Sequence, residues 1–258
     1  MAKIGIVGLG LIGGSIFKDL IKLGYDVIGV SKSQAGSIEK VYAEYSALTG
    51  CDLVFVCKEM SKTLSTLDEL ENYLPPETVV SDVCSLKGFV SEKDYKFNFI
   101  PTHPMAGTEF SGWSASKEGL FKCAKWVITS DKTSELLEKV IKEMGAEIVK
   151  TTPQAHDEAV ALISHAPMVI AQALFKSVED NELAKKLASS GFRDMTRLAL
   201  SSVDMAEDMV SLNSENIEKA ILKLYASVGE LTHGEYRKEI ERIKSERDKM
   251  YRDGVNVL

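Results

Sequence analysis

The sequence predicts an α/β fold in which a Rossmann-type doubly wound sheet is followed by an all-α helical domain. Two observations predict the sheet: short apolar runs alternate with helical patterns up to about residue 152, and a glycine motif directly follows the first run. A third predicts the helical domain, because the chain from residue 154 onward shows long helical patterns and no convincing strand. The expected boundary is therefore a direct step from strand to helix between residues 1–152 and 153–258.

The first half is expected to contain short strands separated by crossover helices, which implies parallel pairing. Helical patterns cover residues 16–23 and 134–144, the second of which is stopped by Gly145. The expected strands are residues 3–7, 26–30, 52–57, 78–83, 98–100, 124–129 and 147–151.

The second half is expected to be helical throughout. Ser214 is a candidate helix start, because a serine side chain can accept hydrogen bonds from first-turn amides. The last helix is heavily charged, which is typical of a solvated outer helix. The expected helices are residues 156–178, 181–188, 205–212, 214–231 and 234–251.

Composition and charge exclude several classes of protein. The 258 residues carry a net charge of −7, which argues against a general binder of nucleic acid or anionic membranes. The start of the chain lacks a signal-peptide pattern and no apolar run looks long enough to span a bilayer, so we expect a cytoplasmic protein. The four cysteines lack metal-type spacing and are expected to be free thiols.

The glycine motif predicts a dinucleotide site. Gly8, Gly10 and Gly13 form G-x-G-x-x-G, with Leu11 and Ile12 between the last two glycines. The first glycine permits a tight turn, the second lets the backbone approach a pyrophosphate, and the third lets the helix pack closely on the strand. The alternative is a simple tight turn, but the motif lies in the strand–helix–strand context that a dinucleotide site requires.

The end of the second strand bears on which dinucleotide binds. An acidic residue usually stands there when the ribose hydroxyls of NAD are bound, whereas this chain has Ser31, Lys32 and Ser33. A cation and two hydroxyls suit an additional 2′-phosphate, so NADP is favoured and NAD stays possible. The alternative is that Lys32 is only a solvated turn residue.

Two loops carry candidate chemical groups. Residues 81–87 (SDVCSLK) and 101–112 (PTHPMAGTEFSG) each follow a predicted strand, where open α/β sheets place their ligands. His103 in the second loop can exchange a proton near neutral pH. By position alone, however, a loop histidine is more often a surface residue.

Five motifs, in this order and spacing, resemble the prephenate/arogenate dehydrogenase family: GLGLIGGS, SDVCSLK, THPMAGTE, AHDEAVALISHAPM and SSGFRDMTR. The resemblance runs from Lys3 to about Asn213. It implies oxidative decarboxylation of arogenate, prephenate or both in tyrosine biosynthesis, with hydride transfer to NAD(P). It also implies a homodimer joined through the C-terminal helices. A dimer is also expected because the helical half has too few residues to bury the apolar faces of several amphipathic helices on one small core.

The resemblance assigns roles to individual residues. His103 is implied to be the base for the substrate's ring hydroxyl, and Ser85 to hydrogen-bond near that hydroxyl and the nicotinamide. His165 and Arg197 are implied to bind substrate, the arginine through a carboxylate. Thr108 is a further candidate substrate contact.

Cys57 and Lys58 are the candidate cofactor contacts after the third predicted strand. Lys58 departs from the family pattern, which commonly has a small or apolar residue followed by proline there.

His156 is expected to be structural, and it makes a poor metal pair with His165 because nine helical positions place the two on opposite faces. No metal is expected.

Two further residues bear on the substrate. If this stretch is helical, Arg193 lies one turn before Arg197 on the same face, and it is either a second cation for the substrate or an ion-pair partner of a residue such as Asp194. Asp204 follows Arg197 by seven residues, which is two turns if the segment is helical, and is either a partner for the ammonium of arogenate or a helix cap. Arogenate is weakly favoured over prephenate.

Two other functions remain open at this point. One is a different two-domain NADP-dependent dehydrogenase, although the catalytic-lysine motif that such enzymes carry on the helical half is not found. The other is a catalytically silent NADP-binding redox sensor, which would not need His103 and Arg197 together.

Overall fold

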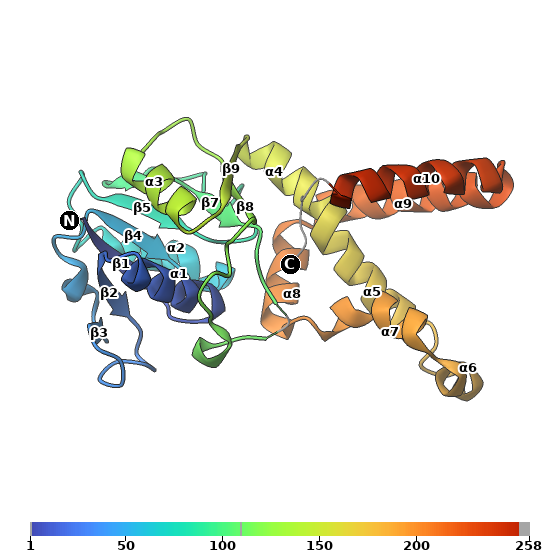
Figure 1. Cartoon of the computed structure of the whole chain (residues 1–258), viewed down its shortest axis with the longest axis horizontal. Coiled ribbons are helices and arrows are strands. Elements are labelled where there is room, and N and C mark those ends of the chain that lie inside the picture. The colour runs from blue at the N-terminus through green and yellow to red at the C-terminus, as the bar shows by residue number, and fades with distance from the viewer. Residues whose placement is uncertain (1, 109, 253–258) are drawn as a thin grey trace. The chain divides into compact units, whose positions relative to one another are not determined.

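The computed structural model describes residues 2–108 and 110–252 and divides the chain into two compact units, Met1–His156 and Asp157–Leu258. The first unit contains a six-stranded parallel sheet (Figure 1). Its order β3-β2-β1-β4-β5-β6 is the strand order of dinucleotide-binding folds, with a topological switch point between β1 and β4. The strands are β1 (Lys3–Val7), β2 (Asp26–Val30), β3 (Val41–Tyr42), β4 (Leu53–Val56), β5 (Val79–Asp82) and β6 (Asn98–Phe99).

Helices cover both faces of this sheet. Successive residues of a strand point to opposite faces, so each central strand contributes side chains to two separate cores. In β4, Leu53 and Phe55 belong to one core cluster, whereas Val54 and Val56 belong to the other. The first cluster includes residues of α1 (Leu11–Lys22) and α3 (Glu135–Glu143), and the second includes residues of α2 (Met60–Leu70). Burial on both faces explains why these strands read as continuous apolar runs.

A second, three-stranded sheet was not expected from the sequence. It consists of β7 (Thr102–Pro104), β8 (Lys125–Ile128) and β9 (Glu147–Lys150), and β7 pairs antiparallel with β8. The expectation of purely parallel pairing was therefore wrong for this part of the chain. A three-residue strand with proline at its end carries too little periodicity to separate it from a loop.

Other elements also differ from the expected ones. The first helix begins at Leu11 rather than at residue 16, because it starts inside the glycine motif. Strand β3, helix α2 and the short 3₁₀ turns η1 (Tyr45–Leu48) and η2 (Trp113–Ala115) had no counterpart among the expected elements.

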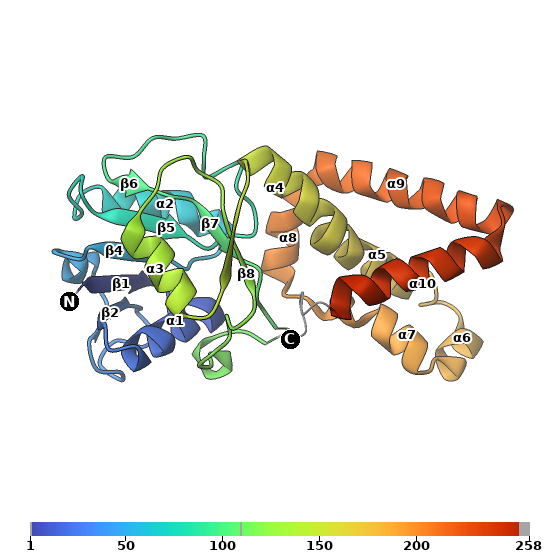
Figure 2. The same cartoon turned by 45° about the horizontal axis from the view of Figure 1, so that its top comes forward.

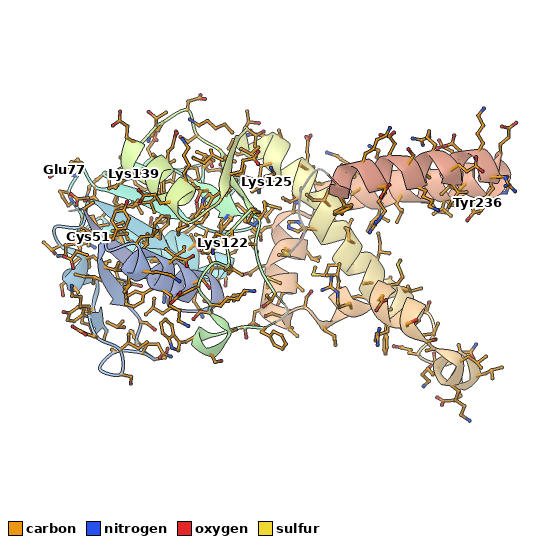
Figure 3. All side chains as sticks on the ribbon, in the orientation of Figure 1. Cys51, Glu77, Lys122, Lys125, Lys139 and Tyr236 are labelled. Atoms are coloured by element: carbon orange, nitrogen blue, oxygen red, sulfur yellow. The ribbon has the colours of Figure 1, made fainter. Side chains whose placement is uncertain are left out.

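Up to residue 252, where the described part of the chain ends, the second unit is helical, as expected, apart from the turns that join its helices. Helix α4 (Pro153–Val160) begins in the first unit and continues through a π-helical turn η3 (Ala161–His165) into α5 (Ala166–Lys176). Figure 2 shows helices α9 and α10 joined by a turn, and Tyr236, the first residue of α10, is labelled in Figure 3. The remaining elements are α6 (Glu182–Leu187), α7 (Ser190–Met195), η4 (Arg197–Leu200), α8 (Val203–Leu212), α9 (Ser214–His233) and α10 (Tyr236–Arg252).

The expected helix start at Ser214 is confirmed, whereas the capping role expected of its side chain was wrong. Asn213 occupies the cap position of α9 and Ser214 is the first helical residue. The Asn213 side chain makes hydrogen bonds elsewhere in the second unit, to Asp157 and His165.

The apolar helix Pro153–Lys176 corrects a further expectation. By length and composition alone, this helix of 24 residues could cross a membrane. No apolar segment of that length was expected from the sequence. About 33% of its most apolar stretch is buried within the protein. A helix that packs in a protein core or against a second subunit passes the same test, so this finding alone is weak evidence for a membrane span.

Candidate active site

The glycine motif forms a tight cradle at the end of β1. Gly8 has φ of +90°, and a Cβ there would lie 2.3 Å from the carbonyl oxygen of Cys57. A Cβ on Gly13 would lie 1.9 Å from the carbonyl oxygen of Gly8, so neither position accepts a side chain. A Cβ on Gly10, in contrast, would meet no described atom within 4 Å. Gly10 therefore borders the open space in which a pyrophosphate can approach the backbone.

Three strand ends meet around this cradle. The Gly8 amide donates to the carbonyl of Val30 on β2 at 2.9 Å, and the Cys57 amide donates to the carbonyl of Val7 on β1 at 2.7 Å. Helix α1 begins here with Leu11 and Ile12, and among the described residues no side chain caps it at Gly10. Its first-turn amides and helix dipole suit an anion, so the cradle fits the phosphates of a dinucleotide.

The end of β2 presents hydroxyls and one cation. Ser31 is buried, and its Oγ lies 3.2 Å from the Oγ of Ser33. The carbonyl of Ser31 accepts the amides of Gln34 and Ala35 at 3.2 and 2.9 Å, which closes a turn. Lys32 lies exposed on this turn, which is compatible with both the phosphate-binding and the solvated alternatives.

Burial disfavours the thiolate form of the cysteines that follow β4 and β5. Burial raises the pKa of Cys57 far above its ordinary value, and burial raises the pKa of Cys84 to about 12. Thr63 on α2 lies 3.1 Å from the Cys84 sulfur. Neither thiol suits nucleophilic chemistry, since that needs a thiolate. Lys58, next to Cys57, is half-buried.

A buried ion pair joins the two candidate loops. Lys87 and Asp82 form a salt bridge in which both side chains are fully buried. The Lys87 ammonium also donates to the carbonyl of Thr102 at 2.6 Å. Asp82 in turn accepts the amides of Cys84 at 2.9 Å and Thr102 at 3.2 Å. The network ties the loop that contains Ser85 to the start of β7.

His103 follows directly in β7, so its backbone is held by that network and by pairing opposite Val127 of β8. Its Nδ1 lies 2.9 Å from Nε2 of His156. Ser85 is half-buried and its hydroxyl donates to the sulfur of Met60 at 3.4 Å. Thr108 lies exposed further along the chain, where its hydroxyl accepts the amide of Phe110 at 3.2 Å.

The second unit positions His165 at the end of the π-helical turn. His165 is fully buried, and the Asn213 side-chain amide nitrogen lies 3.2 Å from its Nδ1. The Asn213 amide is oriented by its partners, since its nitrogen donates to the Asp157 carbonyl at 3.0 Å and its oxygen accepts from Asn216 at 2.9 Å. An amide NH₂ only donates, so Nδ1 accepts and neutral His165 carries its proton on Nε2.

The arginines and Asp204 do not share one helix. Helix α7 ends at Met195, and Arg197 begins a separate 3₁₀ turn. The expectation that Arg193 and Arg197 are one helical turn apart was therefore wrong. Arg193 pairs with its neighbour Asp194 through Nε at 3.2 Å, and both side chains are largely exposed. This pair matches the ion-pair alternative for Arg193.

Asp204 lies in the first turn of α8, beyond an extended stretch at Ser201 and Ser202. The expectation that Asp204 and Arg197 share a helical face was wrong for the same reason. Ser202 holds the cap position, and Asp204 contributes a negative charge next to the positive end of the α8 dipole. The helical-spacing argument for arogenate is lost with this correction.

Sequence reasoning assigned no functional role to four residues that the structure places around the candidates, of which His156 was expected to be structural: Asp82, Lys87, His156 and Asn213. A buried pair within a loop, Asp82 with Lys87, leaves no periodic pattern to detect. Asn213 was hidden by the neighbouring serine, and His156 is 53 positions from its partner His103. Within residues 2–108 and 110–252, no cluster of His, Cys, Asp and Glu suits a metal ion.

Comparison with protein families now identifies the two halves. Residues 19–150 match the family model of the prephenate dehydrogenase nucleotide-binding domain. Residues 152–249 match the model of the prephenate dehydrogenase dimerization domain. The chain belongs to the prephenate dehydrogenase family. This membership confirms the resemblance carried by the five motifs and the expected fold class.

The similar proteins include both prephenate dehydrogenases and an arogenate dehydrogenase. A prephenate dehydrogenase of Bacillus subtilis is 32% identical over 82% of this chain and 64% of its own length. The chain thus spans less than two thirds of that curated relative. The structure of Synechocystis arogenate dehydrogenase is 30% identical, with a TM-score of 0.82, over 96% of this chain and 99% of that one.

A third relative carries ligands. The structure of Aquifex aeolicus prephenate dehydrogenase in complex with hydroxyphenyl propionate and NAD+ is 26% identical, with a TM-score of 0.81. The alignment covers 99% of this chain and 99% of that one. The fold likeness thus extends over both halves of this prephenate dehydrogenase family member.

Proposed function

We propose that this protein oxidatively decarboxylates a cyclohexadienol, arogenate or prephenate, in tyrosine biosynthesis. One observation carries the proposal: in a chain of this family, a buried ion pair holds His103 and the Ser85 loop at the carboxyl end of a dinucleotide-binding sheet. Ligands of open α/β sheets bind at that edge.

The chemistry requires few protein groups. The nicotinamide, when bound, accepts the hydride from the hydroxyl-bearing ring carbon. His103 takes the hydroxyl proton as the carbonyl forms, and Ser85 hydrogen-bonds to the same oxygen. The bond to the ring carboxylate then breaks as carbon dioxide leaves, and its electron pair makes the ring aromatic and turns the carbonyl oxygen into a phenolate, which takes the proton back from His103. Aromatisation drives this step, so the chain needs to supply only a base, cations and orientation.

The direct test is an assay of the purified protein with prephenate and arogenate, each with NAD+ and NADP+. Reduced nicotinamide is followed by absorbance, and the phenolic product and carbon dioxide are measured in parallel. We expect stoichiometric formation of all three with at least one substrate. Tight dinucleotide binding without turnover of either substrate would instead indicate a redox-sensing module.

We propose that Arg197 binds a substrate carboxylate through its planar guanidinium. Arg197→Ala is expected to weaken substrate binding by about 2–5 kcal/mol, because the carboxylate loses a charge-assisted partner. Steady-state kinetics should show a raised substrate KM and an unchanged cofactor KM. Arg242→Ala, which removes an exposed arginine of α10 paired with Glu239, is the matched control. A rise confined to the cofactor KM would move Arg197 to the cofactor site.

We propose that NADP is preferred over NAD, with Lys32 facing the 2′-phosphate and Ser31 and Ser33 beside it. Lys32→Gln is expected to reduce kcat/KM for NADP+ by roughly 10- to 100-fold, the loss of one charge-assisted hydrogen bond of about 1.5–3 kcal/mol. Efficiency with NAD+ should stay unchanged, as should both efficiencies in the exposed control Lys132→Gln. Equal effects of Lys32→Gln on the two cofactors would contradict the proposal.

We propose a homodimer joined through the helical unit. Helix α9 exposes large apolar side chains at helical spacing, including Leu222 at 60% and Tyr225 at 77% exposure. The match to a dimerization-domain model supports this assignment. Sedimentation should give a dimer at micromolar concentration, and the double variant Leu222→Glu with Tyr225→Glu should give a monomer. A dimer that survives both substitutions would place the interface elsewhere.

A further inference from the structure

The contact between His103 and His156 has a role in the proposed chemistry. Nδ1 of His103 lies 2.9 Å from Nε2 of His156, and the two rings meet edge-on with centroids 5.1 Å apart at 77°. His156 is 3% exposed. Both residues belong to the first unit, His103 on β7 and His156 in the opening turn of α4.

Hydrogen bonds hold the backbone on either side of His103 and at His156. Thr102, the residue before His103, is held by Asp82 and Lys87, and Met105 just after β7 donates its amide to the carbonyl of Lys125 at 2.8 Å. Lys125 is labelled on β8 in Figure 3. His156 donates its amide to the carbonyl of Thr152 at 3.0 Å. The 2.9 Å contact therefore sets the rotation of the His103 ring, which the backbone alone leaves undetermined.

A hydrogen bond between two neutral imidazole nitrogens contains one proton, so two arrangements exist. If His156 donates, His103 carries its own proton on Nε2, and that nitrogen cannot accept another. If His103 donates from Nδ1, its Nε2 has a lone pair and can act as a base. Only the second arrangement is competent for the proton transfer proposed above.

We propose that His156 is a positioning residue that accepts the Nδ1 proton of His103 and thereby holds the base in its reactive tautomer. This inference rests on the proposed function. In the step itself the substrate O–H bond breaks, the His103 Nε2–H bond forms, and the ring C–H electron pair leaves as hydride to the dinucleotide. His103 becomes an imidazolium, and its Nδ1–H bond to neutral His156 becomes charge-assisted and stronger.

The tautomer can be measured in the wild-type protein. The chain has only four histidines, so long-range ¹H–¹⁵N correlation spectra with ¹⁵N-labelled histidine can be assigned with single variants. We expect His103 to be protonated at Nδ1 and unprotonated at Nε2 while the pair is neutral. The opposite tautomer, with the proton on Nε2 of His103, would overturn the inference whether or not a substrate has been identified.

Two variants test the consequence for turnover. In His156→Gln the side-chain amide oxygen can replace the accepting Nε2, whereas His156→Met fills the space without a comparable acceptor. We expect His156→Met to lower kcat by about 10- to 100-fold, as lost support for a functional histidine typically does, with little change in either KM. His156→Gln should recover most of that loss. Equal kcat in wild type and His156→Met, or equal losses in both variants, would overturn the inference.

Cofactor binding, followed by fluorescence of the reduced dinucleotide, shows that each variant is folded. If His156→Met fails to fold, the tautomer measurement and the His156→Gln kinetics decide the question. Failure of the proposed function gives a different result from failure of this inference, because the wild-type enzyme would then turn over neither substrate. A wrong base assignment appears as full activity of His103→Ala.

Discussion

His103→Ala is expected to lower kcat by about 100- to 10,000-fold, the usual contribution of one general base. The substrate's hydroxyl proton must leave as hydride departs, and alanine has no group to accept it. Because the β7 backbone is held by Asp82 and Lys87 through Thr102, the substitution should leave the fold and the dinucleotide cradle intact. Steady-state and single-turnover kinetics provide the measurement.

The control is His233→Ala, which removes an exposed histidine near the end of α9. It should turn over at the wild-type rate with unchanged thermal stability. Cofactor affinity should be unchanged in both variants, since the cradle lies at the ends of β1, β2 and β4. Turnover of His103→Ala at a near wild-type rate would remove His103 from the mechanism.

Lys87→Met is expected to reduce the free energy of unfolding by about 3–5 kcal/mol, because it leaves the buried Asp82 carboxylate without its counter-charge. Both side chains of this ion pair are fully buried. The substitution also removes the hydrogen bond from Lys87 to the Thr102 carbonyl next to His103. We therefore expect lower kcat in addition to lower stability. Denaturant unfolding monitored by fluorescence gives the stability change.

Lys22→Met is the matched control, since Lys22 pairs with Glu118 in a salt bridge whose side chains are 68% and 53% exposed. Exposed pairs of this kind contribute about 0–1 kcal/mol. The double variant Asp82→Asn with Lys87→Met should recover part of the lost stability, because no uncompensated charge remains. Equal stability losses in Lys87→Met and Lys22→Met would show that the buried pair does not organise the two loops.

Much of the nucleotide-binding half was predictable from local patterns. The runs around β1, β2, β4 and β5 are apolar because both faces of a parallel sheet are buried. The glycines of the cradle were recognisable because Gly8 and Gly13 have no room for a Cβ. The three glycines themselves lie close together in the chain, so they appear in the sequence as a fixed spacing, although the Gly8 contact is with Cys57 after β4.

The helical half was less predictable in detail. Helix existence follows from amphipathic periodicity, but the π-helical turn before His165 and the break at Thr196 follow from contacts within the fold. The break separates Arg193, Arg197 and Asp204 onto three elements. Arguments from helical spacing failed there because periodicity does not reveal where one helix ends and the next begins.

The sequence by itself determined the fold class, the dinucleotide cradle, the family and the identity of His103 as a candidate base. Only the tertiary structure showed that Asp82 and Lys87 hold the loops of Ser85 and His103, that Asn213 sets the proton on His165, and that His156 contacts His103. The physical reason is the distance along the chain over which each feature leaves a pattern. Buried strands and the glycine motif each leave a pattern within a few consecutive residues, whereas the His103–His156 contact joins residues 53 positions apart and leaves no periodic pattern.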